Sequence, residues 1–162
     1  LIIQMMTFIT LKKREKLKKM VNYSVINELN YSNKQMFDLI IDVKKYPEFL
    51  PWCLSTNLYS KQSNIFYSDM EIGFNLIKEK FTSKVTFNDG EKILSESVSG
   101  PFSKMINIWN IKKLSKNKCE ITLIIEFEFK SLLLKNLMGK LFEIASKKMI
   151  ESFEARANEL YN

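Results

Sequence analysis

The sequence predicts an α+β fold in which a curved antiparallel sheet of about seven strands wraps around one long C-terminal helix. Between residues 53 and 129 the hydrophobic pattern has a period of two and is interrupted only by short turns, which is typical of strands joined as hairpins. No stretch alternates strand with helix, so the sheet is expected to be antiparallel. From Ser131 to Tyr161 apolar residues recur at steps of three and four without a proline, which predicts one helix of roughly 45 Å.

The chain before these hairpins predicts one strand and two short helices. Val21–Leu29 alternates weakly and is expected to form the first strand. Ser32 to Gln35 has the form of a capping box, so a helix is expected to begin there and to end at Asp42. Pro47 suits the first turn of a second helix and Pro51 prevents its continuation, which leaves a helix of a single turn.

Six further strands are predicted, joined by five turn signals. The turns are expected at Lys61 to Asn64, Gly73 to Leu76, Asn88 to Gly90, Gly100 with Pro101, and Ser115 to Lys118. The first of these strands is expected to place Leu54, Thr56 and Leu58 on one face. The last is the clearest, because six apolar residues at alternate positions run from Cys119 to Phe129. Six consecutive strands linked in this way twist and curl, so the long helix is expected to fill the concave face.

The long C-terminal helix is predicted to carry two apolar stripes. The first runs its whole length and is expected to dock on the sheet; it consists of Leu134, Met138, Phe142, Ala145, Met149, Phe153, Ala157 and Leu160. The second occupies the first half of the helix and consists of Leu133, Leu137, Leu141 and Ile144. The second stripe needs another apolar partner, either more of the protein or a ligand, and ordinary core packing is the default expectation.

Positive charge is concentrated at the start of the chain. The 162 residues carry a formal net charge of +7, but residues 1–19 hold +5 and the remainder only about +2. The high pI therefore belongs to a tail and is not the footprint of a nucleic-acid-binding surface, and DNA is not expected as a partner. Apolar residues precede the charges, which is the reverse of a secretory signal, and they are too few to span a bilayer. We expect one domain over residues 20–162 beginning at Met20, and a basic tail that is disordered or lies upstream of the natural start.

Side chains that carry catalysis are scarce. The chain has no histidine, which removes the commonest general base and the commonest metal ligand. Its two cysteines, Cys53 and Cys119, have neither a metal-binding spacing nor a histidine to activate them, and they suit a reducing cytosol. Carboxylate pairs such as Asp69 with Glu71 fall on an outward strand face, where solvated carboxylates are the usual case. We therefore expect neither an enzyme nor a cofactor.

A surplus of large apolar side chains is expected near one end of the molecule. Its members are Tyr46, Phe49, Leu50, Trp52, Phe74, Trp109, Leu137, Met138 and Leu141. They could form an ordinary core, or they could line a cavity where the helix and the sheet diverge. The eight methionines of the chain favour a surface that adapts to varied apolar shapes.

The octapeptide YPEFLPWC, residues 46–53, resembles the signature of the coenzyme Q-binding START-like family, which is related to polyketide cyclases and includes the bacterial RatA ribosome-association toxins. Three weaker motifs agree with it in order. They are Gly100-Pro101-Phe102 followed by Trp109, the junction from Glu126 to Ser131, and Phe153 to Ala157 followed by Tyr161. The resemblance covers Met20 to Tyr161, and residues 1–19 lie outside it.

The resemblance implies a helix-grip fold, also called START-like or Bet v 1-like, with a hydrophobic tunnel between the sheet and the long helix. It implies binding of ubiquinone or another polyprenyl lipid, in support of respiratory electron transport and ubiquinone biosynthesis. Tyr46, Trp52 and Cys53 are then expected to frame the mouth, and Pro47 joins the expected ligand-binding set. Trp52 resembles the quinone-binding branch, since glycine stands at that place in the toxin.

Partners and location follow from the same resemblance. Phe74 and Leu76 are expected to touch a membrane surface transiently, which gives a cytoplasmic protein that is peripheral at the inner membrane. The alternative is a ribosome-association toxin that binds the large subunit and blocks subunit joining, with Lys78, Lys80 and Lys84 clustering with Lys112 and Lys113 as the basic surface. An enzyme of the polyketide cyclase type is the weakest of the three hypotheses, because acid–base residues are scarce.

Overall fold

The computed structural model describes residues 21–74 and 76–162, except for the side chains of residues 21–22, 138–140 and 142–143. Over these residues seven strands form one antiparallel sheet whose order is β1-β7-β6-β5-β4-β3-β2. The strands are β1 (Val21–Leu29), β2 (Cys53–Gln62), β3 (Ile65–Phe74), β4 (Ile77–Asn88), β5 (Lys92–Ser99), β6 (Phe102–Ser115) and β7 (Lys118–Phe129). The helices are α2 (Asn33–Ile41), the 3-10 helix η1 (Val43–Lys45), α3 (Tyr46–Phe49) and α4 (Leu132–Tyr161).

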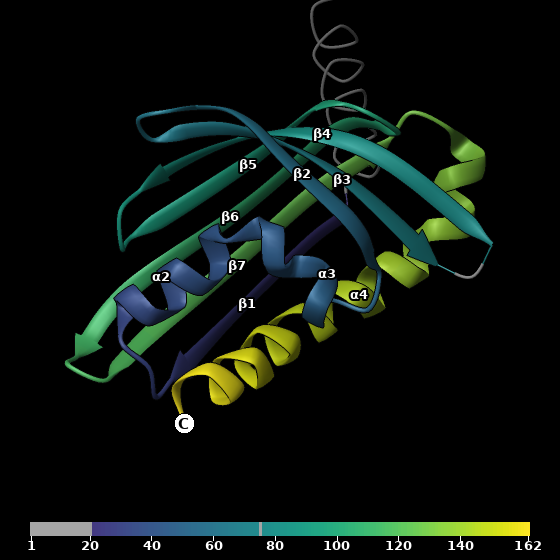
Figure 1. Ribbon diagram of the computed structural model, residues 1–162. Coiled ribbons are helices and arrows are strands. Elements are labelled where there is room, and N and C mark those ends of the chain that lie inside the picture. Colours follow the sequence, from purple (N-terminus) through teal and green to yellow (C-terminus); the bar gives the residue numbers. More distant parts are fainter. Residues whose placement is uncertain (1–20, 75) are drawn as a thin grey trace, which may run out of the picture.

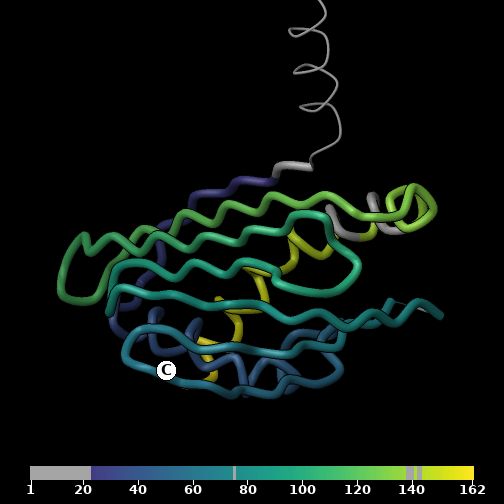
Figure 2. Tube along the Cα trace, turned by 90° about the horizontal axis from the view of Figure 1, so that it is seen from above, coloured from purple at the N-terminus to yellow at the C-terminus, as the bar shows by residue number. Residues whose placement is uncertain are grey.

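The sheet arches over the helices, which all lie on its concave side (Figure 1). Consecutive strands from β2 to β7 are hairpin neighbours, and β1 pairs with β7, so the first and last strands lie next to each other. The long α4 crosses beneath the sheet diagonally, as the view from above also shows (Figure 2). The helix-grip arrangement expected from the sequence is therefore confirmed.

The start of α2 confirms the predicted capping box. The Ser32 hydroxyl accepts a hydrogen bond from the backbone N–H of Gln35 at 3.2 Å, and the Gln35 side chain accepts one from the backbone N–H of Ser32 at 2.9 Å. The predicted one-turn helix is α3, with Pro47 in its first turn. The 3-10 helix η1 before it was not predicted, because its three residues give no period of their own.

The predicted turns lie where expected, with one correction on β2. Gly90 and Gly100 have φ angles of +72° and +117°, a backbone region that favours glycine in tight turns. Leu54 does not share a face with Thr56 and Leu58, because a register shift between Cys53 and Ser55 turns Leu54 outward. Sequence alternation alone does not reveal such a bulge.

The sheet-facing stripe of α4 is confirmed over most of its described length. Ala145, Phe153 and Ala157 are buried against the sheet, whereas Leu160 is half exposed and the prediction for it is wrong. Tyr161 takes the inward position instead: its hydroxyl donates to the backbone oxygen of Gln35 at 3.0 Å, and its ring packs on Tyr31. The C-terminus is thereby tied to α2.

The second stripe of α4 is largely exposed. Leu133, Leu137 and Ile144 are 67%, 50% and 52% exposed, and only Leu141 is partly buried against the core. The default expectation that other protein covers this stripe is wrong, because three of its four residues are at least half exposed. The predictions for residues 1–19, Met20, Met138 and Phe142 lie outside the described residues or side chains.

Candidate functional site

An apolar cavity of about 110 Å³ lies between the concave face of the sheet and the middle of α4. Its walls come from every layer of the fold. The helical side contributes Val43, Tyr46, Leu50, Trp52, Ala145, Ser146, Met149 and Phe153, and the sheet contributes mainly aromatic and aliphatic residues of β3, β4, β6 and β7. The cavity exists because two short helices and one long helix cannot fill a strongly curved sheet completely.

An aromatic cluster fixes the helical wall of the cavity. The ring of Phe153 lies 5.0 Å from that of Trp109, 5.4 Å from that of Tyr46 and 5.1 Å from that of Phe49, all in edge-on geometry. The Tyr46 hydroxyl donates to the backbone oxygen of Ile40 at 2.6 Å, which ties α3 to the end of α2. Aromatic pairs of this kind contribute about 0.5–1.5 kcal/mol each beyond their burial, so this wall is rigid.

Charged groups on the outer side of the same cluster hold α3 against α4. The Arg156 guanidinium lies 5.8 Å from the centre of the Phe49 ring and 2.6 Å from the Glu48 carboxylate, and Lys45 also contacts Glu48 at 2.8 Å. These contacts lower the pKa of the Glu48 carboxyl group, with the Lys45 hydrogen bond as the main cause. These charged groups lie outside the cavity, so they stabilise its wall and would not contact a bound ligand.

Trp52 and Phe74 close one end of the cavity. Their rings stack with centroids 6.3 Å apart and planes 11° apart. The backbone N–H of Gly73 donates to the backbone oxygen of Trp52 at 2.9 Å, so the segment after α3 is fastened to the end of β3. A side chain at Gly73 would meet Leu54, which leaves little room for this junction to change.

Four small polar residues interrupt the apolar inner face of the sheet. Ser68, Ser83, Ser95 and Asn107 come from the adjacent strands β3, β4, β5 and β6, and all four line the cavity. They were not predicted from the sequence. Their signal was present, since Ser83 stands between the inward positions of Phe81 and Val85, and Asn107 between those of Met105 and Trp109.

The electrostatics of the cavity favour neutral guests. Among the described residues, no Lys, Arg, Asp or Glu lines it. Burial raises the pKa of the Tyr46 hydroxyl, so that group stays protonated. Burial also raises the pKa of the nearby Cys53 thiol to about 11, which keeps it a thiol at neutral pH. The described residues also contain no cluster of three or more carboxylates or thiols that could hold a metal ion.

The structure brings together part of the predicted site. Tyr46, Leu50, Trp52, Phe74 and Trp109 line the cavity. Phe49 supports the wall from outside, Pro47 is exposed, and Cys53 is buried beside the cavity without lining it. Leu137 is half exposed and Leu141 packs on the core, so neither lines this space, and the side chain of Met138 is not among those described. A ligand-binding role for any of these residues remains a prediction.

The sequence matches a known family over most of its length. Residues 29–154 match the family model described as polyketide cyclase / dehydrase and lipid transport. The ribosome association toxin RatA of Pseudomonas aeruginosa is 32% identical over 133 residues, which cover 82% of this chain and 92% of that protein. The mitochondrial coenzyme Q-binding protein COQ10 of Dictyostelium discoideum is 35% identical over 147 residues, which cover 88% of this chain and 72% of that protein.

Solved structures share the fold. The Zhui aromatase/cyclase from Streptomyces sp. R1128 superposes with a TM-score of 0.79 at 11% identity, covering 88% of this chain and 96% of that one. The 18 kDa protein CC1736 from Caulobacter crescentus superposes with a TM-score of 0.70 at 29% identity, covering 87% of this chain and 98% of that one. The first likeness shows the fold alone, since cyclases and binding proteins are built on the same scaffold.

Proposed function

The chain belongs to the polyketide cyclase / dehydrase and lipid transport family, and from that premise we propose that it is a non-enzymatic binding protein for ubiquinone or a related isoprenoid quinone. In this role it supports respiratory electron transport and ubiquinone biosynthesis. The observation that carries the proposal is the apolar cavity between the sheet and α4. A relative named as a coenzyme Q-binding protein, 35% identical to this chain, supports the same ligand class.

The cavity is somewhat smaller than one known to hold a ring. A dry cavity of about 150 Å³ in another protein holds benzene, and the cavity here is about 110 Å³. A substituted ring therefore enters only if lining side chains shift, and the flexible Met70, Met105 and Met149 are suited to that. Ring burial at roughly 25 cal/mol per Å² is a sufficient driving force for a lipid head group. A polyprenyl tail does not fit into this space, so we propose that the ring enters the cavity while the tail lies outside it.

The side chains around the cavity argue against catalysis. General acid–base chemistry needs a group that exchanges protons near neutral pH. Tyr46 is the one hydroxyl of an aromatic ring among the described lining residues, its pKa is raised by burial, and its proton is donated to Ile40. The family also includes cyclases. The described residues that line this cavity could bind a small molecule, but they supply no group that would transfer a proton to it.

One end of the molecule presents leucines to its surroundings. Leu76 in the β3–β4 turn is fully exposed, and Leu132, Leu133 and Leu137 in the first turns of α4 are at least half exposed. The β3–β4 turn and the start of α4 lie at the same end of the molecule in both views (Figures 1 and 2). Exposed apolar groups of this size mark interaction surfaces, and we name these four residues the leucine end.

We propose that the leucine end touches a lipid bilayer transiently, so that quinone can move between membrane and cavity. Lys78 and Lys130 flank it, are exposed, and have no acidic partner among the described residues, which suits an anionic lipid surface. None of the described helices is long and apolar enough to cross a membrane. The location that we propose is the cytoplasm, with peripheral contact at the inner membrane.

Lipid extraction tests the proposal directly. Protein purified from a quinone-producing host without detergent is extracted with solvent, and the extract is analysed by mass spectrometry. We expect a quinone or another isoprenoid near stoichiometric amounts, or stoichiometric uptake when decylubiquinone is supplied. Absence of co-purifying lipid together with no uptake would refute the proposal.

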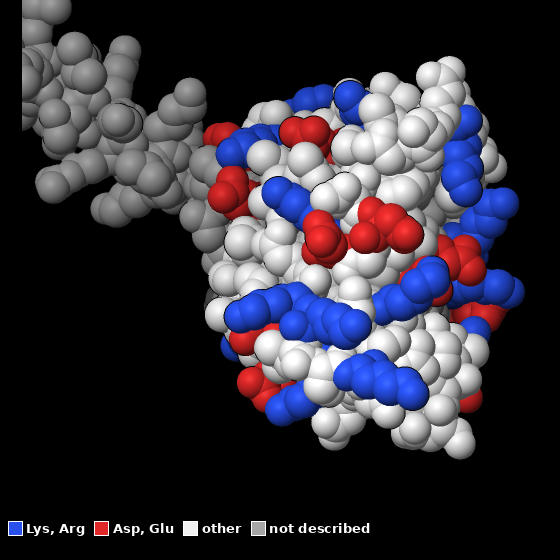
Figure 3. All heavy atoms as spheres, turned by 90° about the vertical axis from the view of Figure 1, so that its left-hand side faces the viewer, with Lys and Arg blue, Asp and Glu red and all other residues white. Residues whose placement is uncertain are grey.

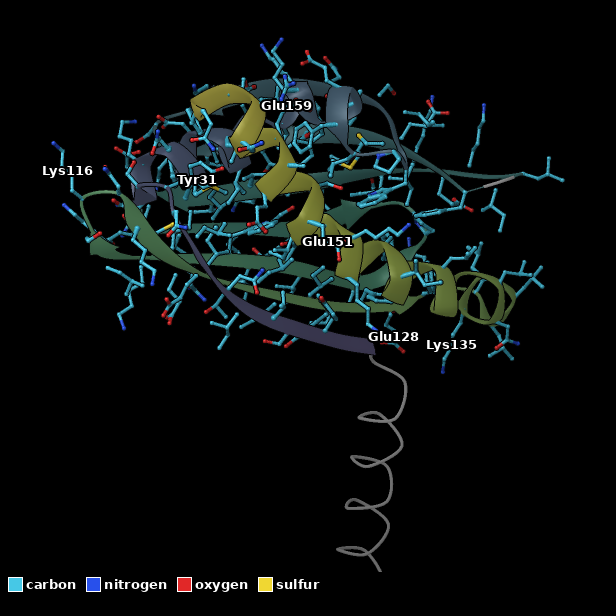
Figure 4. All side chains as sticks on the ribbon, turned by 90° about the horizontal axis from the view of Figure 1, so that it is seen from below. Tyr31, Lys116, Glu128, Lys135, Glu151 and Glu159 are labelled. Carbon is cyan, nitrogen blue, oxygen red and sulfur yellow. The ribbon has the colours of Figure 1, made fainter. Side chains whose placement is uncertain are left out.

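The alternative function is association with the large ribosomal subunit, as in the relatives named RatA. A specific observation favours it: the β6–β7 hairpin carries Lys112, Lys113, Lys116 and Lys118 at the end opposite the leucine end. Figure 3 shows this end, with Lys and Arg side chains in bands and acidic groups between them, and Figure 4 labels Lys116 at its tip.

The basic surface differs from the one predicted from the sequence. Lys78 lies near the start of β4 and Lys112 at the far end of β6, so the two groups of lysines do not form one cluster. Part of the hairpin charge is also neutralised, since Lys118 forms an ion pair with Glu28 and Lys112 lies opposite Glu120. Co-sedimentation with large subunits that is lost as salt is raised would support the alternative, and no co-sedimentation at low salt would refute it.

A further inference from the structure

The polar band inside the cavity has a geometry that the fold alone does not require. Ser68 lies opposite Ser83 in the β3–β4 register, and Ser95 lies opposite Asn107 in the β5–β6 register. The four residues therefore cross four neighbouring strands of the concave face as two pairs. The second pair is displaced from the first by two residues along the strands, because Ser83 lies opposite Ser97 and Ser95 lies opposite Val85. All other described sheet residues that line the cavity are aromatic or aliphatic, so the band is a local exception.

Two members of the band lack a hydrogen-bond partner within the described protein. Ser83 is 4% exposed, and neither its hydroxyl oxygen nor the Oδ1 atom of Asn107 has a partner there. Ser68, by contrast, donates to the backbone oxygen of Asp69 at 3.5 Å. Burying a polar group without a partner costs free energy, and the large majority of buried polar side-chain atoms in folded proteins are paired. A partner from outside the chain is therefore expected for Ser83 and Asn107.

The chemistry of the two groups defines that partner. A hydroxyl can donate or accept, and an amide presents a donor and an acceptor on the same side chain. A carboxylate or phosphate is disfavoured, because no cationic residue among those described lines the cavity and a buried charge needs a counter-charge. The fitting guest is a neutral ring with oxygen substituents, whether these are carbonyl acceptors or hydroxyl donors.

The spacing of the two groups agrees with such a ring. Ser83 and Asn107 lie on β4 and β6 with β5 between them, so their strands are about 9–10 Å apart, and the two-residue displacement adds about 7 Å along the strands. The two backbone positions are therefore about 12 Å apart. A six-membered ring with an oxygen at each end and a hydrogen bond of about 2.8 Å to each oxygen has a length of the same order.

We infer that Ser83 and Asn107 form a polar anchor that recognises the ring oxygens of the bound lipid and accepts both its quinone and its quinol form. The inference rests on the proposed function, because it assigns the head-group contacts of the same cavity. Selectivity between an oxygenated ring and a plain hydrocarbon ring then resides in these two side chains, and the aromatic walls supply affinity without selectivity.

Three ligands of nearly equal shape test the anchor. Duroquinone, its quinol and durene share a ring with four methyl groups and differ in the two oxygens. Binding is measured by calorimetry to the wild type, to Ser83→Ala and to Asn107→Leu. The matched controls are Ser24→Ala and Asn110→Leu, which make the same changes away from the cavity, on the outer face of the sheet.

We expect the wild type to bind duroquinone and the quinol more tightly than durene. Each anchor variant should lose about fivefold to tenfold in affinity for both oxygenated ligands, which is the range of one net hydrogen bond, and should keep its affinity for durene. The empty Ser83→Ala variant should unfold at the same or a higher denaturant concentration than the wild type, because an unpaired buried hydroxyl is removed.

The possible failures are distinguishable. If the wild type binds all three ligands equally, or if both folded variants bind duroquinone within twofold of the wild type, the anchor is refuted while quinone binding stands. A marked loss of stability in Ser83→Ala would also refute it, since the hydroxyl would then have a structural partner. If the wild type binds none of the three, the proposed function itself fails.

Discussion

Filling the cavity from α4 should abolish ligand binding without unfolding the protein. Ala145 is buried in the middle of α4 and lines the cavity beside Met149 and Phe153. In Ala145→Phe, the added phenyl group points from the helix into a space of about 110 Å³, which is close to its own size. The side chain then occupies the place proposed for the lipid ring.

The magnitude follows from the area that a ring buries. A ring of this kind buries roughly 150–200 Å², which at about 25 cal/mol per Å² is worth about 4–5 kcal/mol. Loss of this free energy of ring burial lowers the affinity for the ligand by about a thousandfold or more. The stability of the protein should change by less than about 2 kcal/mol, because the gain from burying a phenyl group offsets the cost of a tighter fit.

The chain contains its own reporters for this assay. Its two tryptophans, Trp52 and Trp109, both line the cavity, so a quinone that binds there should quench their fluorescence. Ala155→Phe is the matched control, since the same change is made on the exposed side of the same helix. Quenching by decylubiquinone should persist in the control and vanish in Ala145→Phe. A folded Ala145→Phe protein that binds within threefold of the wild type would show that the ligand does not use this cavity.

Three further predictions concern the turns, a buried thiol and the leucine end. Gly100→Ala should destabilise the fold by about 3 kcal/mol in urea denaturation, because its φ is +117° and a new Cβ would lie 2.5 Å from a side-chain atom of β4. Gly90→Ala, where φ is +72° and the nearest atom is 3.3 Å away, should cost about 1 kcal/mol, and equal losses would contradict the reasoning. At pH 8 iodoacetamide should alkylate Cys53 about a hundredfold more slowly in the folded protein than in urea, since burial raises its pKa from 9.0 to about 11; equal rates would contradict this. Leu132→Glu with Leu133→Glu should reduce flotation with anionic liposomes severalfold and leave decylubiquinone binding intact, and unchanged flotation would remove the leucine end from the proposal.

The fold was predictable because its local signals agree with one another. The alternation of β7, the capping box at Ser32 and the prolines around α3 each specify an element that needs no distant partner. Turn glycines then fix the order of the hairpins. Two predictions of the fold failed: Leu54 is turned outward by a bulge, and Tyr161 instead of Leu160 faces the core at the end of α4. Both outcomes depend on how neighbouring elements pack.

The cavity was predictable only in part. Large aromatic residues such as Trp52 and Trp109 are conspicuous in a sequence, and they do line the space. Ser83 and Asn107 are not, because a single polar residue in an alternating strand usually marks an irregular or outward position. Recognising them requires the register that aligns the inward positions of β3, β4, β5 and β6. The curvature of the sheet, and with it the size of the cavity, depends on tertiary packing, which the hydrophobic periodicity of a sequence does not reveal.

The exposed stripe and the cavity together bear on where a lipid tail would lie. Leu133, Leu137 and Ile144 are exposed and follow one line along the first half of α4, whereas the cavity lies against the middle of the helix. Each buried CH₂ group of a tail is worth about 0.8 kcal/mol. If the stripe sheltered the tail, affinity would rise steeply with each isoprene unit; if the tail stayed in the bilayer, affinity in solution would depend on the ring alone. The stripe is exposed and shares Leu133 and Leu137 with the leucine end. Both facts favour the second case, in which the tail stays in the membrane while the ring binds in the cavity.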